Sequence, residues 1–394
     1  MQNKIYKNFL RNYYLSSALN DFIFAYAVYS VIFNINGLSV FQISILFAWW
    51  AISSLLFEIP SGALADHWSR KKLLISAPII KSFCFLIWIL ADGNFYLYAL
   101  GFLFWSISGS FRSGTQEALL YDNLVFFKKK KDYQKILGRK KFYMYIVLAL
   151  SMIIGGFIAH VSLDLVLLAS IFPLYFSSFF ASQLHEAPKI KSTEEVNYLD
   201  HIKIAWREIK VNKVLIYLMI YLVGIEIFGS LEEFNGLYYR SIDLPIFSFG
   251  ILEFSWTMLS AIGSYYAYKF SKWPIIFVLS PLINIFLFLI ISWNPVIQTV
   301  ALLILTYGIN SPLSILVDNK IQDNIKSNSR ATIISAIQFM IGFICILIMP
   351  LIGWINKLYG FPVVYLFVGG WLLVLTVWTI FNKKIFLKNT YNKP

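Results

Sequence analysis

Apolar residues fill this chain in long continuous runs of about 20 residues, separated by short polar stretches. A helix of that length matches the hydrocarbon thickness of a lipid bilayer. Because lipid offers no hydrogen bonds, a spanning backbone must form either helices or a closed barrel. A barrel would need short strands of alternating apolar and polar residues, whereas these runs are continuous. The pattern therefore predicts an all-α integral membrane protein.

Twelve such runs are long enough to cross a bilayer. The longest polar stretch follows the sixth run and divides the chain into two parts. We expect an N-terminal six-helix half over 1–184, a cytoplasmic linker over 185–211 and a C-terminal six-helix half over 212–394. The predicted spans are 12–35, 40–62, 73–91, 95–124, 142–161, 163–184, 212–239, 246–269, 274–293, 296–318, 331–354 and 361–382.

The composition supports this class of protein. Of the 394 residues, 59% are hydrophobic and 13% charged, and the mean hydropathy is +0.69. A net charge of +13 is compatible with nucleic-acid binding, but its placement argues against that partner. With both termini in the cytoplasm, all 33 Lys and Arg residues fall in cytoplasmic segments except Lys81, Arg112, Arg240 and Lys357. We therefore expect a multi-pass protein of a bacterial cytoplasmic membrane, with both termini inside and lipid as its partner.

The loop after the second predicted span, Gly62 to Lys72, has a distinctive sequence, GALADHWSRKK. It resembles the loop pattern Gly-x-Leu-Ala-Asp-x-x-Gly-Arg-Lys/Arg of the major facilitator superfamily, with Ser69 in place of the second glycine. Residues 57–62 (FEIPSG) and 113–122 (SGTQEALLYD) are similar to an efflux-like bacterial branch of that superfamily. The resemblance implies two pseudo-symmetric six-helix halves and secondary transport by alternating access.

In that family, the loop aspartate and arginine resemble a charge relay with an aspartate at the end of the fourth span. We therefore expect Gly62, Asp66, Arg70 and Asp122 to form a conformational latch. Arg70 offers a rigid fork to a carboxylate, and Asp66 lies where a helix N-terminus can accept it. The alternative is a simple charged turn. The corresponding loop of the second half keeps only Lys272, so any latch is one-sided.

Ionisable residues inside the predicted spans are the candidates for function, because an unpaired charge in hydrocarbon is costly. Counting about 1.5 Å of rise per residue places Asp21 and Arg112 near mid-membrane, with Glu117 closer to the cytoplasm. We predict that all three line a substrate and proton cavity. A carboxylate beside an arginine could act as a proton switch or form a static pair. By the same count Glu58 and Lys81 lie at equal depth, which favours a structural ion pair over a role in substrate binding.

Acidic residues also gather in the predicted seventh and eighth spans. They suggest an acidic external vestibule that binds a cation or proton, or merely a solvated mouth. Glycines around these acids in the seventh span indicate a bent or broken helix. Polar side chains in the tenth and eleventh spans could bond a substrate. The predicted cavity residues of the second half are Glu226, Glu232, Glu233, Glu253, Asn310 and Gln338.

Enzymatic chemistry has no support in this sequence. The four histidines lie at or beyond span ends without metal-ligand spacing, and no phosphate-binding loop is present. We expect no enzyme activity, no metal and no cofactor, and a proton gradient as the driving force.

The leading interpretation is a monomeric, proton-coupled exporter of a small organic molecule. One alternative is proton-coupled uptake of a small anionic metabolite or a metal chelate such as a siderophore, with Arg112 contacting the anion. A second alternative is a membrane receptor that transports nothing.

Overall fold

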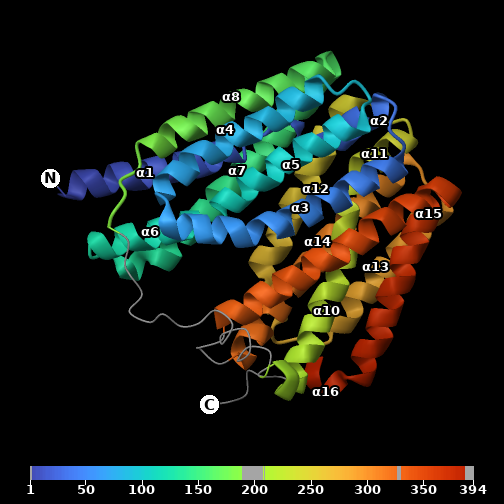
Figure 1. Cartoon of the computed structure of the whole chain (residues 1–394). Coiled ribbons are helices and arrows are strands. Elements are labelled where there is room, and N and C mark those ends of the chain that lie inside the picture. Colours follow the sequence, from blue (N-terminus) through green and yellow to red (C-terminus); the bar gives the residue numbers. More distant parts are fainter. Residues whose placement is uncertain (1, 189–206, 208, 326–329, 387–394) are drawn as a thin grey trace. The chain divides into compact units, whose positions relative to one another are not determined.

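The computed structural model describes residues 2–188, 207, 209–325 and 330–386, with every side chain except those of 59–67 and 330–332 (Figure 1). The described part of the chain is helical and divides into two compact units. The first unit comprises Met1–Thr193 and Pro245–Phe254, and the second comprises Glu194–Leu244 and Ser255–Pro394.

Within the first unit, α4 packs against both α5 and α8, α3 packs against α5, and α1 packs against α7 and α8. Figure 1 shows α4 running between α5 and α8. The elements are α1 (Gln2–Asn20), η1 (Phe24–Ala27), α2 (Tyr29–Ile35), α3 (Val40–His67), α4 (Arg70–Ile89), α5 (Phe95–Arg112), α6 (Thr115–Phe126), η2 (Lys130–Asp132), α7 (Tyr133–Val161) and α8 (Leu163–Ser182).

Small polar residues begin and connect these helices. Asn94 caps α5 by accepting hydrogen bonds from the Tyr96 and Leu97 amides, and Ser162 caps α8 through the Leu165 amide. Two serines of α8 bond neighbouring helices: Ser177 Oγ donates to the Ser16 carbonyl at 2.7 Å, and Ser178 Oγ to that of Ile75 at 2.8 Å. Such bonds and close packing hold helices together in lipid, where apolar burial gives little driving force.

Two predicted spans are broken. The first was expected to be one helix over 12–35, but α1 ends at Asn20, and η1 and α2 follow as separate elements. The fourth was expected to be one helix over 95–124, but it divides into α5 and α6. There Gly114 has φ +66°, a backbone conformation that favours glycine.

The second unit begins with α10, whose span continues through the 3-10 segment η3, as the glycine-rich sequence predicted. α10 packs against α14 and α15, and α13 also packs against both of those helices. The elements are α10 (Lys213–Gly229), η3 (Ser230–Phe234), α11 (Asn235–Ser241), α12 (Ile246–Phe270), α13 (Ile276–Trp293), α14 (Ile297–Asn324), α15 (Arg330–Phe381) and α16 (Lys383–Phe386). The first residues of α12 belong to the first unit.

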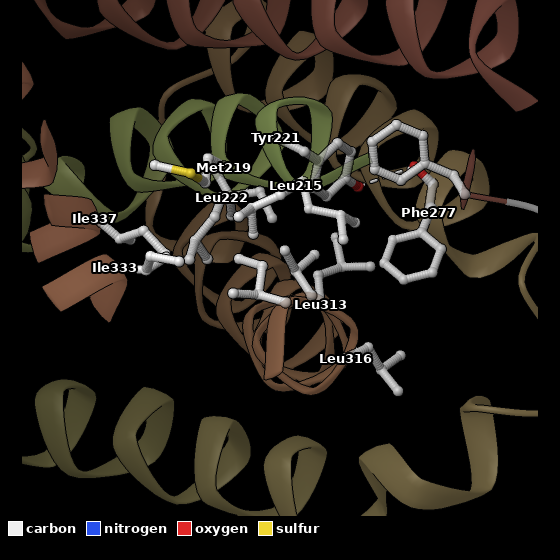
Figure 2. Packing of buried hydrophobic residues seen from close by; sticks show 14 of the residues in the cluster. Leu215, Met219, Tyr221, Leu222, Phe277, Leu313, Leu316, Ile333 and Ile337 are labelled. Carbon is white, nitrogen blue, oxygen red and sulfur yellow. Dashed lines mark hydrogen bonds between the residues drawn. The ribbon is translucent and has the colours of Figure 1, made fainter. Parts of the chain in front are cut away.

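Figure 2 shows the packed core of this second unit. Leucines of α10 and α14, including Leu215 and Leu313, meet Ile333 and Ile337 of α15. The Tyr221 hydroxyl, fully buried, donates to the Phe277 carbonyl at 3.0 Å, so this buried polar group is satisfied.

The described residues contain ten helical segments that are long and apolar enough to cross a membrane. The broken α5–α6 pair accounts for the fourth predicted span. The last two predicted spans both lie within α15, where two helices meet at Gly360, whose φ of +78° is not helical. The prediction of a twelve-helix, all-α membrane protein is confirmed.

Candidate functional site

A cavity of about 440 Å³ lies inside the first unit, where both broken spans meet α4 and α7. Its size is within the usual range for small-molecule sites. Four of its lining side chains are ionisable acids or bases, and aromatic rings form part of the wall. The lining residues are Asn20, Asp21, Tyr26, Lys81, Trp105, Ser108, Gly109, Arg112, Ser113, Gly114, Gln116, Glu117 and Met144.

Asp21 and Arg112 face each other across this cavity, each beside the break in its own span. Arg112 Nη1 lies 3.6 Å from Asp21 Oδ1, which also accepts a hydrogen bond from Asn20 Nδ2 at 3.0 Å. The other carboxylate oxygen, Asp21 Oδ2, is buried and has no hydrogen-bond partner among the described residues. One oxygen of this carboxylate is therefore held by donors while the other is not.

Arg112 is also connected to α1 through a glutamine. Its Nη2 donates to Gln116 Oε1 at 3.3 Å, and Gln116 Nε2 in turn donates to Ser17 Oγ. Because Ser17 lies one turn before Asp21, the two broken spans share a hydrogen-bond network as well as an ion pair.

Glu117 pairs with a residue that the sequence did not indicate. Lys140 Nζ lies 2.7 Å from Glu117 Oε1, and Lys140 is only 8% exposed. The sequence placed Lys140 in a basic loop, because the apolar run begins at residue 142. Helix α7 instead begins at Tyr133 and carries Lys140 inward. No hydropathy signal distinguishes this lysine from its exposed neighbours.

The predicted ion pair between Glu58 and Lys81 is not what the structure shows. Lys81 Nζ donates to the Tyr26 hydroxyl at 2.9 Å, and Glu58 Oε1 accepts a hydrogen bond from Ser113 Oγ at 2.7 Å. The physical reason is that each residue finds a partner on another element: Tyr26 on η1 for Lys81, and Ser113, just after α5, for Glu58. Equal depth did not make them neighbours, and Lys81 instead lines the cavity.

Two members of the predicted latch are in contact. Arg70 forms an ion pair with Asp122, and their side chains are only 15% and 7% exposed. The side chains of Gly62 and Asp66 lie outside the described residues. The pair therefore connects the start of α4 to α6, as expected from the loop pattern and the end of the fourth span.

The segment after α8 also reaches this surface, which the sequence did not reveal. Glu186 accepts hydrogen bonds from Ser69 Oγ at 2.6 Å and from the Lys71 amide at 3.3 Å. His185 Nδ1 lies 2.7 Å from Asn123 Oδ1. Burial lowers the pKa of His185, and the charge of Lys71 lowers it further, so the ring is neutral at neutral pH. The beginning of the predicted linker is thus bonded to the latch loop.

Five of the six predicted cavity residues of the second half lie on the second unit. Glu226 lies on α10, Glu232 and Glu233 on η3, and Asn310 and Gln338 on α14 and α15 of the second unit. Glu253, on α12, is 6% exposed and belongs with the first unit, but does not line the cavity. Asn310 is 7% exposed, whereas Glu232 and Gln338 are exposed.

Comparison with known proteins gives the family. The sequence model of the Major Facilitator Superfamily matches residues 13–349. The chain belongs to the major facilitator superfamily. No curated protein sequence matches it. This membership makes the chain a membrane transporter rather than an enzyme, working by alternating access.

Solved structures of this superfamily have the same fold. The nucleoside transporter NupG (D323A mutant) aligns with a TM-score of 0.80 at 15% identity, covering 95% of this chain and 99% of its own. An inward-facing, unoccupied bacterial homolog of the lysosomal transporter Spinster aligns with a TM-score of 0.76 at 15% identity, covering 100% and 99%. A D-xylose–proton symporter aligns with a TM-score of 0.69 at 13% identity, covering 98% and 99%.

Proposed function

We propose that this transporter is a proton-coupled exporter of a small organic molecule, and that Asp21 binds the coupling proton. The observation that carries the proposal is the uneven environment of the Asp21 carboxylate: Oδ1 is held by Arg112 and Asn20, whereas Oδ2 is buried without a donor. A buried carboxylate oxygen with no donor is where a proton would bind in such a site.

The position of the pair supports a role in conformational coupling. Asp21 follows the end of α1 and Arg112 ends α5, so each lies at a break in a membrane span. Protonation of Asp21 removes the counter-ion of Arg112, which keeps Gln116 as a partner and becomes available to substrate. The two protonation states then favour different arrangements of the broken spans, which is a population shift between conformations.

Export, rather than uptake, is proposed because residues 57–62 and 113–122 resemble efflux-like members of the superfamily. The second candidate is proton-coupled uptake of a small anion, including an anionic metal chelate. Two lysine or arginine side chains in the cavity, Lys81 and Arg112, favour that candidate. In either case the carrier would work as a monomer in the bacterial inner membrane, driven by the proton gradient without a bound cofactor.

The first test is proton release from inside-out membrane vesicles that contain the protein and have an acidified lumen. A library of small organic molecules is added, and luminal pH is followed with a dye. An exported molecule should enter the lumen and discharge the gradient. Asp21→Asn should slow this response by about 5- to 150-fold, which is the factor that corresponds to a typical coupling free energy between two sites.

Asp21→Glu keeps the acid and should retain part of the response. The matched control is Asp164→Asn, which removes an exposed acid at the start of α8, away from the cavity, and should behave as wild type. Wild-type proton release by Asp21→Asn would refute the assigned proton site. Uptake by symport moves the proton and the molecule in the same direction. Acidification of the lumen of right-side-out vesicles, when the molecule is added in an acidic medium, would therefore establish uptake instead. No response in either orientation would favour the receptor.

A further inference from the structure

Lys81 is a buried cation that the proposed proton switch does not use. It is 4% exposed, lies on α4, and lines the cavity together with Tyr26 and Trp105. Nζ donates to the Tyr26 hydroxyl at 2.9 Å and lies 4.5 Å from the centre of the Trp105 ring and 5.2 Å from that of Tyr26. An ammonium group has three donors, and one is used here.

The other charges of the cavity are already matched with one another. Asp21 lies beside Arg112, and Glu117 pairs with Lys140. No carboxylate of the described side chains lies within ion-pairing distance of Lys81 Nζ. The charged side chains that line the cavity, together with Lys140, therefore leave one positive charge in excess. We assign it to Lys81, on which the charge of Asp21 acts only from beyond ion-pairing distance.

A hydroxyl and two aromatic faces stabilise a cation in hydrocarbon, but they do not neutralise it. A membrane site with an unmatched positive charge is well suited to receive an anion. Lys81 also lies beside an indole ring on the cavity wall, and such rings pack well against flat apolar groups. The charge of Lys81 thus specifies an anionic group at one end of a ligand, and the indole ring specifies a flat apolar group at the other.

We infer that Lys81 is the anion-binding group of the cavity, and that the carried molecule is an organic anion with a flat apolar body. Its carboxylate or phosphate group binds the Lys81 ammonium, and its body packs beside Trp105. This inference rests on the proposed carrier function and adds a substrate class to it. It also assigns Lys81 a role separate from Arg112, which remains the partner of the proton site.

The test is ligand-dependent thermal stabilisation of the purified full-length protein in detergent. The probes are benzoate, its neutral isostere benzamide, phenyl phosphate and inorganic phosphate. Benzoate or phenyl phosphate should raise the melting temperature, benzamide should not, and inorganic phosphate should act more weakly than phenyl phosphate. A preference for benzoate would identify a carboxylate ligand, and one for phenyl phosphate a phosphate ligand.

Lys81→Met should weaken anion binding by at least about tenfold, because a charge-assisted hydrogen bond is lost. Lys81→Arg keeps the charge and should retain the response. The matched control is Lys130→Met: Lys130 also lies over an aromatic ring, that of Tyr121, but outside the cavity, and its loss should change nothing.

Equal stabilisation by benzamide and benzoate, no stabilisation by any anion, or an unchanged anion response in Lys81→Met would each overturn the inference. The comparison of benzoate with benzamide needs no variant, so it decides even if Lys81→Met fails to fold. Binding in detergent requires no gradient. Anion binding without transport in vesicles would therefore refute the carrier and leave the anion site standing.

Discussion

Arg70 and Asp122 show how a single contact can be tested apart from the helices around it. Their side chains are 15% and 7% exposed, so water screens the pair little. We expect Arg70→Gln and Asp122→Asn each to lower the thermal stability of the purified protein, because each leaves a charge without its partner. The double variant should be less destabilised than the sum, by about 1–3 kcal/mol of coupling.

Melting temperatures of the four proteins, together with their transport rates, measure this coupling. Asp122 has other contacts as well, and the double-variant cycle removes their share from the pair energy. Arg139, near the start of α7, provides a control, since Arg139→Gln and Asp122→Asn should be additive. Additive effects of Arg70→Gln and Asp122→Asn would show that the contact contributes nothing to stability.

The sequence predicted contacts in the cavity where the depth of a residue in the membrane was enough to place it. It failed where the contact depended on which face of its helix the side chain occupies. The helix rise placed Asp21 and Arg112 at similar depth, and the structure brings them together. The same argument failed for Glu58 and Lys81, because depth does not say which face of a helix a side chain occupies. Lys140 was missed because its charge placed it in a predicted loop.

At the scale of elements, the break between α1 and η1 depends on close approach of another helix. Gly155 of α7 packs against the backbone of Phe24, and a Cβ at Gly155 would lie only 1.9 Å from the Phe24 carbonyl oxygen. The Ala25 amide, adjacent to that contact, donates to Ser170 Oγ of α8 at 3.0 Å. The two neighbouring helices, α7 and α8, thus hold the 3-10 segment η1 in place after Asp21.

Gly155→Ala should therefore displace η1 and destabilise the protein by about 1–3 kcal/mol, the usual cost of overpacking. Transport should fall with it, because Asp21 precedes the displaced segment by three residues. The control is Gly138→Ala in the same helix, where a Cβ would meet nothing within 4 Å. The measurement is the melting temperature of each variant. Equal values for the two variants would mean that stability does not depend on the close approach of Gly155 to Phe24.

The breaks themselves were not predicted, because a hydropathy pattern reports where a chain is apolar and not whether its helix is continuous. Polar residues did mark both places: Asn20 and Asp21 interrupt the first apolar run, and Ser113 and Gly114 the fourth. In the seventh span, where glycines are denser, the bend was predicted and is present as η3. Two adjacent polar residues at or beside an intramembrane charge are therefore the sequence signal that predicts a break in a membrane helix.

At the scale of the whole molecule, the number of spans and the placement of charge together predict orientation. Twelve spans, an even number, place both termini on one side of the membrane. Lys and Arg residues concentrate in the segments on that side, which favours the cytoplasm. The side of the membrane that holds the termini is thus predicted from charge.

Reporter fusions can test that prediction in the intact chain. Alkaline phosphatase needs disulfide bonds and is active only outside the cytoplasm, whereas green fluorescent protein matures inside it. Fused to the C-terminus, the fluorescent protein should be bright and the phosphatase inactive. Fused after residue 294, between α13 and α14, the phosphatase should be active, which provides the matched control. The reverse result at both positions would invert the topology, and with it the side from which the Asp21 cavity and the Arg70–Asp122 pair are reached.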